Sequence, residues 1–171
     1  MKIRIAGTVG ESIVDGPGFR YTVFTQGCPH GCKGCHNPHT HDYSGGFTAD
    51  TDDILEEIKK DPLLDGVTFS GGEPFSQCVP LADLGRKIKA IDSGRLNIIS
   101  YTGYTFEYLL ENAEKIDGCK ELMNVVDYLV DGRFIEEQRS LELKFRGSKN
   151  QRFIDMKSSL AAGKAVEFTD L

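Results

Sequence analysis

Apolar residues recur along the chain with two different periods. Alternating or continuously apolar runs, both typical of β-strands, cover residues 2–6, 19–25, 66–70, 96–101, 125–130 and 152–155. Helical spacing covers residues 51–60 and 105–113, and it also relates Leu81, Leu84, Ile88 and Ile91. Strands and helices therefore alternate, which predicts an α/β fold with a mostly parallel sheet built from βαβ units.

Four glycine-bearing loops each follow one of the predicted strands. They contain residues 26–34, Gly71 with Gly72, Thr102 with Gly103, and Asp131 with Gly132. Parallel strands bring the loops that follow them to one edge of the sheet, and ligands of such sheets bind beyond the carboxyl ends of the strands. We therefore expect one site that uses all four loops.

The segment from residue 26 to residue 46 follows neither period. It holds three of the five cysteines and all four histidines, interrupted by glycine and proline. A loop longer than about 12–15 residues in a compact domain is usually functional. We therefore treat residues 26–46 as the main candidate for a binding loop.

Length and charge narrow the range of functions. Lys and Arg number 20 against 26 Asp and Glu, and the resulting net charge of −6 disfavours nucleic acid as a partner. No apolar stretch reaches the roughly 18–20 residues that cross a bilayer, and the first residues do not resemble a signal peptide, so we expect a cytoplasmic protein without membrane association. The 171 residues predict one domain, residues 1–171, too short for a complete eight-fold barrel of about 250 residues.

The cysteines in the loop have the spacing Cys28-x3-Cys32-x2-Cys35. An odd number of cysteines without an export signal favours metal-binding or catalytic thiols over disulfides. Three thiolates suit a four-iron cluster that leaves one iron open, whereas a structural zinc ion needs a fourth ligand, such as a histidine. The spacing favours iron–sulfur and leaves zinc open. Cys78, at the start of a helix, and Cys119, in a polar loop, are interpreted as lone thiols.

A second motif, Gly71-Gly72-Glu73-Pro74, follows the strand at residues 66–70. Glycines at this position remove side chains and expose backbone N–H and C=O groups, which suits a zwitterionic ligand. Glu73 adds a carboxylate that suits an ammonium group. A plain turn is the alternative interpretation.

The cysteine triplet, followed by GGEP after the next strand, resembles the radical S-adenosylmethionine superfamily. Within it, VDGPGFRYTVFTQGCPHGCKGCHNP looks like the activases of glycyl-radical enzymes. VDYLVDGRFIEEQRS and FRGSKNQRFID are similar to the short members, which activate anaerobic ribonucleoside-triphosphate reductase. The matched stretches run from about residue 13 to residue 155.

The resemblance implies an open, partial (β/α) barrel and a radical oxidoreductase. Cys28, Cys32 and Cys35 would hold a [4Fe–4S] cluster whose open iron binds S-adenosyl-L-methionine. Reductive cleavage of that cofactor would give a 5′-deoxyadenosyl radical, which takes hydrogen from a glycine of the reductase and leaves a glycyl radical. The partner would be the reductase, and reduced flavodoxin the typical electron donor.

The resemblance also implies cofactor contacts. The segment that holds the methionyl amino group is matched by Gly71, Gly72 and Glu73. The stretch that borders the adenine is matched by Gly34, Cys35 and His36. A further cofactor contact aligns loosely with Thr102 and Gly103. No catalytic residue is expected beyond the cluster and the cofactor. The alternatives are an activase of another glycyl-radical enzyme, such as pyruvate formate-lyase, and a non-catalytic zinc-binding interaction module. Asp15, Arg20, Asp131, Arg133 and Arg146 receive no role.

Overall fold

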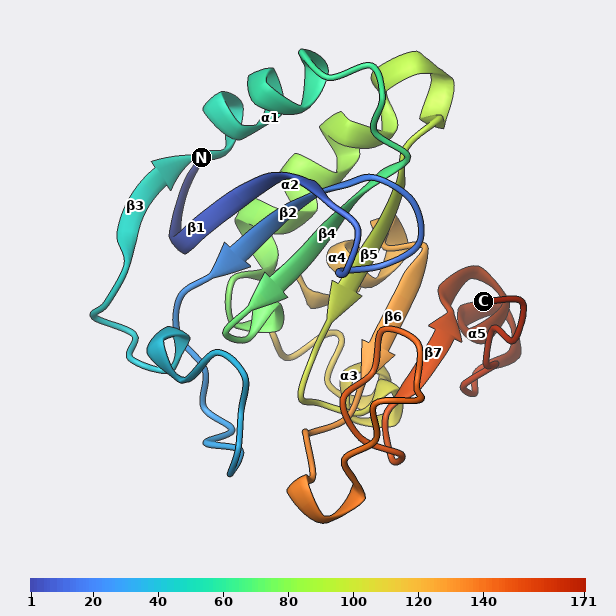
Figure 1. The fold of residues 1–171 in the computed structure, drawn as a ribbon. Helices are drawn as coiled ribbons and strands as arrows, with labels where there is room; N and C mark the ends of the chain where they lie inside the picture. Colours follow the sequence, from blue (N-terminus) through green and yellow to red (C-terminus); the bar gives the residue numbers. More distant parts are fainter.

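The computed structural model describes residues 1–171, which form a mixed α/β structure around one open seven-stranded sheet (Figure 1). The strand order is β3-β1-β2-β4-β5-β6-β7. The strands are β1 (Lys2–Ser12), β2 (Arg20–Thr25), β3 (Phe47–Asp50), β4 (Gly66–Gly71), β5 (Asn97–Tyr101), β6 (Tyr128–Asp131) and β7 (Arg152–Asp155). The central strands β2, β4, β5 and β6 are parallel, whereas β1, β3 and β7 pair antiparallel.

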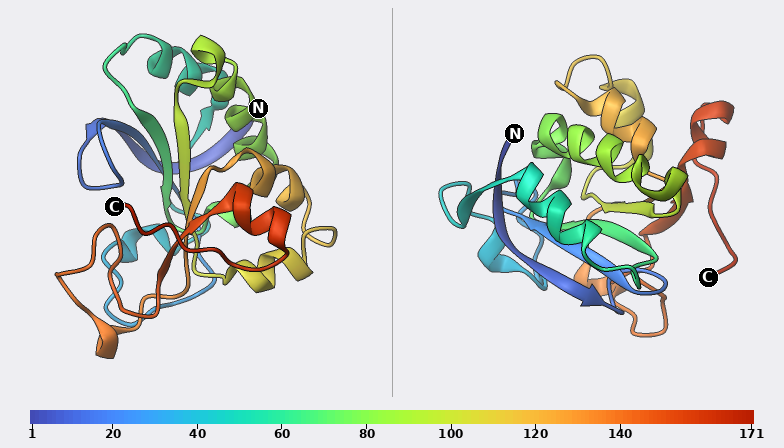
Figure 2. Two further views of the ribbon diagram at one scale, coloured as in Figure 1. Left: turned by 90° about the vertical axis from the view of Figure 1, so that its right-hand side faces the viewer. Right: turned by 90° about the horizontal axis from the view of Figure 1, so that it is seen from above.

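Five α-helices accompany the sheet. They are α1 (Thr51–Lys59), α2 (Cys78–Lys89), α3 (Phe106–Glu111), α4 (Cys119–Val125) and α5 (Met156–Ala162). Helices α1, α2, α4 and α5 contact one another in that order, and they cover one face of the sheet (Figure 2). The opposite face is left to loops. No helix of the structure combines the length and the apolar character needed to cross a membrane.

The main core lies between the helices and the central strands. Val23, Val67 and Phe69 are fully buried in β2 and β4, as expected for strands of a parallel sheet, which are covered on both faces. On α2, Leu81 and Leu84 are fully buried at helical spacing. The predicted βαβ pattern is thus confirmed in the centre of the sheet.

The edges of the sheet differ from the prediction. Strand β1 is much longer than residues 2–6, and β3 was not predicted at all; both run antiparallel. The predicted strand at residues 125–130 begins only at Tyr128, because Val125 still belongs to α4. Cys119 begins that helix and is fully buried against α2, so its placement in a polar loop was wrong. Here packing against a neighbouring helix outweighs the local pattern.

Candidate cluster and cofactor site

A cavity of about 880 Å³ lies beyond the carboxyl ends of the four parallel strands. The arrows of these four strands run in the same direction (Figure 1). Each of the four predicted loops supplies part of its wall; the residues concerned are Cys28, Cys32, Cys35, Gly71, Gly72, Thr102, Gly103 and Gly132. The structure therefore brings together loops that are far apart in the sequence.

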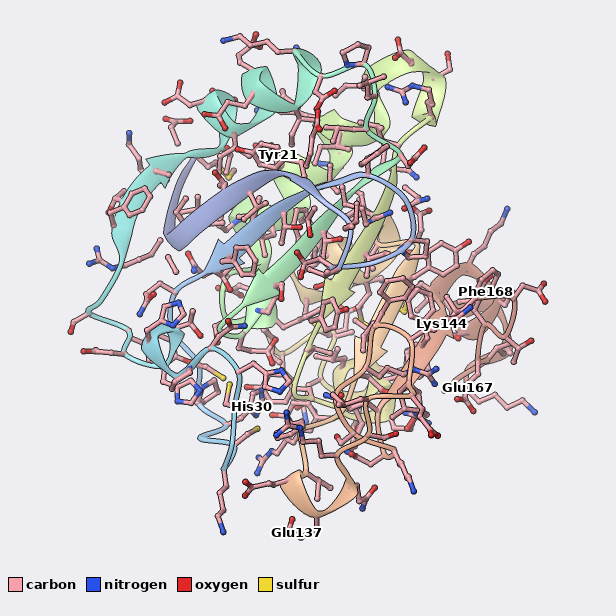
Figure 3. The ribbon with its side chains drawn as sticks, viewed as in Figure 1. Tyr21, His30, Glu137, Lys144, Glu167 and Phe168 are labelled. Carbon is pink, nitrogen blue, oxygen red and sulfur yellow. The ribbon has the colours of Figure 1, made fainter.

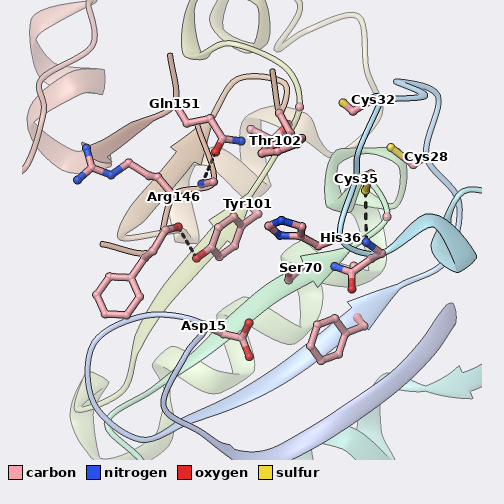
Figure 4. Close-up of a pocket in the computed structure, with 18 of the residues that line it drawn as sticks. Asp15, Cys28, Cys32, Cys35, His36, Ser70, Tyr101, Thr102, Arg146 and Gln151 are labelled. Atoms are coloured by element: carbon pink, nitrogen blue, oxygen red, sulfur yellow. Dashed lines mark hydrogen bonds between the residues drawn. The ribbon is translucent and has the colours of Figure 1, made fainter. Parts of the chain in front are cut away.

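The three thiols of the loop share one side of this cavity (Figure 4). Cys28, Cys32 and Cys35 are all half-buried and free of disulfides. The Cys35 sulfur accepts a hydrogen bond from the backbone N–H of Asn37 at 3.4 Å. Burial raises the pKa of the Cys28 thiol. Nowhere in the structure do three or more His, Cys, Asp or Glu side chains converge closely enough to hold a single metal ion.

Hydrogen bonds at its base hold the cysteine loop in place. The N–H groups of Gly27 and Cys28 donate to the carbonyls of Thr40 and His41 at 2.7 and 3.1 Å. The Gln26 side-chain amide adds bonds to two further carbonyl groups of the returning chain. The two ends of the loop are therefore tied together, and residues 29–36 project from this base.

The loop after β4 packs directly on the cysteine loop. Glu73 N–H donates to the Gly27 carbonyl at 2.8 Å, and Gly72 N–H donates to the Thr25 carbonyl at the same distance. A Cβ atom on Gly72 would lie 2.4 Å from the Gly27 oxygen. Because that oxygen belongs to the backbone, only glycine permits this contact between the two loops.

Two of the residues expected at the cofactor do not line the cavity. Gly34 instead lies against the side chains of Phe134 and Glu136. Glu73 is fully buried, and its carboxylate is bonded to groups of the protein. Gly71, Gly72, Cys35, His36, Thr102 and Gly103 do line the cavity.

The opposite wall comes from residues 132–151, of which the sequence had assigned only Gly132 to the site. Tyr101 donates its hydroxyl hydrogen to the Phe145 carbonyl at 2.7 Å. Gln151 accepts from Gly147 N–H at 2.8 Å and donates to the Gly132 carbonyl at 3.0 Å. These bonds hold the segment at the cavity, where Tyr101, Arg146 and Gln151 line the side opposite the three thiols (Figure 4). The sequence signals for this segment were the VDYLVDGRFIEEQRS and FRGSKNQRFID stretches, which carry no chemical assignment of their own.

Asp131 lies next to this wall but does not line the cavity. Its buried carboxylate accepts from Phe106 N–H, at the start of α3, at 2.8 Å and from Arg152 Nε at 3.0 Å. The hydrogen bond to Asp131 raises the pKa of Arg152. Asp131 thus joins the end of β6 to α3 and β7 and does not face the cavity.

Comparisons with known proteins define the class to which this fold and site belong. The family described as "4Fe-4S single cluster domain" matches residues 14–154. The chain is 37% identical over 145 residues to the anaerobic ribonucleoside-triphosphate reductase-activating protein of Vibrio cholerae, covering 81% of this chain and 89% of that protein. The protein of the same name from Escherichia coli K12 is 36% identical over 145 residues, with 81% and 90% covered.

A pyruvate formate-lyase-activating enzyme from Listeria monocytogenes is 36% identical over 135 residues, with 76% of this chain but only 53% of that enzyme covered. The chain belongs to the family of anaerobic ribonucleoside-triphosphate reductase-activating proteins, within the radical S-adenosylmethionine superfamily that its motifs resemble. The predicted family is thereby confirmed.

Proposed function

We propose that this protein is the activating enzyme of an anaerobic ribonucleoside-triphosphate reductase. The observation that carries the proposal is the meeting of three free thiols and two glycine-bearing loops on one cavity, in a chain of this family. When bound there, a [4Fe–4S] cluster supplies the electron that cleaves S-adenosyl-L-methionine reductively, so that a glycyl radical is formed on the reductase.

The residues present fit such a group. Cys28, Cys32 and Cys35 are soft thiol ligands, free and partly buried, within eight residues of one loop. A cluster accepts thiolates at separated corners, whereas a lone zinc ion needs its sulfur ligands about 2.3 Å from one centre. A cavity of about 880 Å³ lies within the range of roughly 300–1,000 Å³ that is usual for small-molecule sites.

The chain's contribution to the reaction is placement and enclosure. Gly71 and Gly72 present backbone without side chains to the cavity, which suits the polar methionyl end of the cofactor. His36 packs on Phe134 with ring centroids 5.2 Å apart and supplies an aromatic surface for the adenine. These walls limit the access of water to a reactive centre.

The mouth of the cavity suits a protein substrate. Val14 and Leu141 line the rim and are 73% and 89% exposed. Exposed apolar side chains around an opening are typical of a surface that binds another protein. We propose that the glycine-bearing segment of the reductase enters here, and that reduced flavodoxin donates the electron.

The second candidate is an activase of pyruvate formate-lyase, which the similarity to the Listeria enzyme favours. The reductase is favoured because the match covers 89% of the Vibrio cholerae reductase-activating protein but only 53% of the Listeria enzyme. Mixing the reduced protein and S-adenosyl-L-methionine with each partner, and recording the glycyl radical by electron paramagnetic resonance, separates the two. A radical on the lyase alone would replace our assignment.

The cluster assignment is tested by replacing one ligand. Wild-type protein reconstituted without oxygen should contain about four iron and four sulfide ions. With dithionite as reductant, it should form 5′-deoxyadenosine from S-adenosyl-L-methionine. Cys32→Ala should lose both properties, whereas Cys78→Ala, which changes a buried core thiol, should keep them. A colourless wild-type protein with one zinc ion would contradict the proposal and favour the zinc-binding module.

A further inference from the structure

The spacer between Cys28 and Cys32 contains a buried histidine. The His30 side chain, labelled in Figure 3, is 3% exposed. Its Nε2 atom lies 2.6 Å from Oε1 of the fully buried Glu73. A carboxylate only accepts hydrogen bonds, so Nε2 carries the hydrogen and donates it. The ring also packs edge-on against Tyr104, with centroids 4.6 Å apart.

The same carboxylate binds two further loops. Oε1 accepts from Gly103 N–H at 2.7 Å, and Oε2 accepts from Phe75 N–H at 2.9 Å. The Thr102 hydroxyl lies within 3.0 Å of both oxygens. Glu73 therefore connects the loops that follow β2, β4 and β5, and its acceptor capacity is taken up by groups of the protein.

The spacer has little else to hold it. No backbone–backbone hydrogen bond involves the spacer residues 29–31, and the bond from Cys35 N–H to the Cys32 carbonyl lies beyond them. Just after the spacer, Lys33 forms an exposed ion pair with Glu136 at 3.8 Å, a type that contributes little to stability. A Cβ atom on Gly31 would meet nothing within 4 Å. The His30 side chain is thus the main anchor of this segment.

His30 lies midway between two of the thiols along the chain, two residues after Cys28 and two residues before Cys32. Residues that hold a metal ligand from behind fix its orientation, and their loss weakens metal binding. The bond between His30 and Glu73 therefore fixes the middle of the loop that carries both proposed ligands.

We propose that Glu73 and His30 are a pair of positioning residues that hold the spacer and orient Cys28 and Cys32 for the cluster. This inference rests on the proposed function of the cysteines. It gives Glu73 a different task from contact with the methionyl amino group, because its oxygens do not line the cavity.

Two amide substitutions at one position test the pair in the full chain, reconstituted without oxygen. In His30→Gln the amide N–H reaches Glu73, whereas in His30→Asn the same amide is one methylene too short. His30→Asn should release iron to a chelator about 10- to 100-fold faster than wild type, the usual effect of losing a partner behind a metal ligand. His30→Gln should remain close to wild type in this measurement, as should the exposed control His39→Gln.

Glu73→Gln should release iron as fast as His30→Asn, and the double variant should be no worse than either single one, since both remove one interaction. If His30→Asn and His30→Gln release iron at the same rate, whether fast or slow, the proposed role of the Glu73–His30 hydrogen bond is wrong. So would a Glu73→Gln variant that keeps iron but binds S-adenosyl-L-methionine more weakly, which would place Glu73 at the ammonium group. Failure of the wild-type chain to take up a four-iron cluster would instead contradict the proposed function.

Discussion

Two fully buried charged side chains lie at opposite ends of the parallel strands. Arg20 opens β2 at the amino end of the sheet, and Glu73 follows β4 at the carboxyl end. Neither is exposed to solvent. Burying a charge is costly unless its hydrogen-bonding groups find partners, and the two ends of the sheet meet this cost in different ways.

Arg20 is satisfied mainly by the sheet itself. It donates to the Val67 and Asn97 carbonyls at 2.9 and 3.3 Å, to the Thr68 hydroxyl at 2.7 Å, and to the Pro17 carbonyl at 3.1 Å. Burial lowers its pKa to about 10. Most of these acceptors are placed by strand pairing, so Arg20 stabilises an arrangement that the register of the sheet already defines.

Glu73 is satisfied mainly by loops. Its donors come from His30, Phe75, Thr102 and Gly103, which strand pairing does not place. The carboxylate therefore helps to define the geometry of the loops. The comparison teaches that a buried charge at the amino end serves the fold, whereas a buried charge at the carboxyl end serves the site.

The largest expected effect is a loss of folding stability at Arg20 that leaves iron binding at the site unchanged. Arg20→Met should lower the free energy of unfolding by at least about 3 kcal/mol, because each buried acceptor that loses its donor costs about 1–3 kcal/mol. Urea denaturation measures this change, with the exposed Lys59→Met as a control that should stay within about 0.5 kcal/mol of wild type. Iron retention per folded molecule should not change. If Arg20→Met stays stable but loses iron, the conclusion that Arg20 serves the fold and not the site is wrong.

A smaller loss of stability is expected where the loop after β4 contacts the cysteine loop, at Gly72 and Gly27. Gly72→Ala should lower the free energy of unfolding by about 1–3 kcal/mol, because its Cβ overlaps the Gly27 oxygen and the loops must separate. Iron release should also become faster, since Gly27 precedes Cys28. Gly7→Ala, with nothing within 4 Å of the added Cβ, is the matched control and should change neither property. Thermal denaturation and chelator competition test both, and unchanged iron release by Gly72→Ala would count against the coupling.

The smallest expected effect is the pH dependence of the stability that Tyr21, the neighbour of Arg20 in β2, contributes. Burial and a hydrogen bond to Glu57 raise the pKa of Tyr21 to about 12, above the usual value near 10. The folded protein holds this proton more tightly, so the contribution of Tyr21 is complete below pH 10 and is lost as the pH rises toward 12. The stability advantage of wild type over Tyr21→Phe should therefore shrink as the pH rises from about 10 to about 12 in urea denaturation. A constant difference would show that Tyr21 titrates normally.

The sequence by itself determined the local parts of the molecule. The strand patterns at residues 19–25, 66–70 and 96–101 agree with β2, β4 and β5 to within a residue or so, because β-branched and aromatic residues there are buried between neighbours on both faces. The parallel order then brought Cys28, Gly72 and Gly103 to one edge, as expected. Sequence spacing alone sufficed for this, since all three follow parallel strands directly.

Only the tertiary structure decided which way the side chains of the site point. The sequence pattern could place Glu73 next to a cavity, but its direction depends on donors from His30 and Gly103, which lie on other loops. The wall made by residues 132–151 likewise depends on Tyr101, which lies outside that segment, and on Gln151, which binds the Gly132 carbonyl at its other end. Local patterns record which surfaces are buried, whereas the partners of a buried polar group are known only when distant segments have come together.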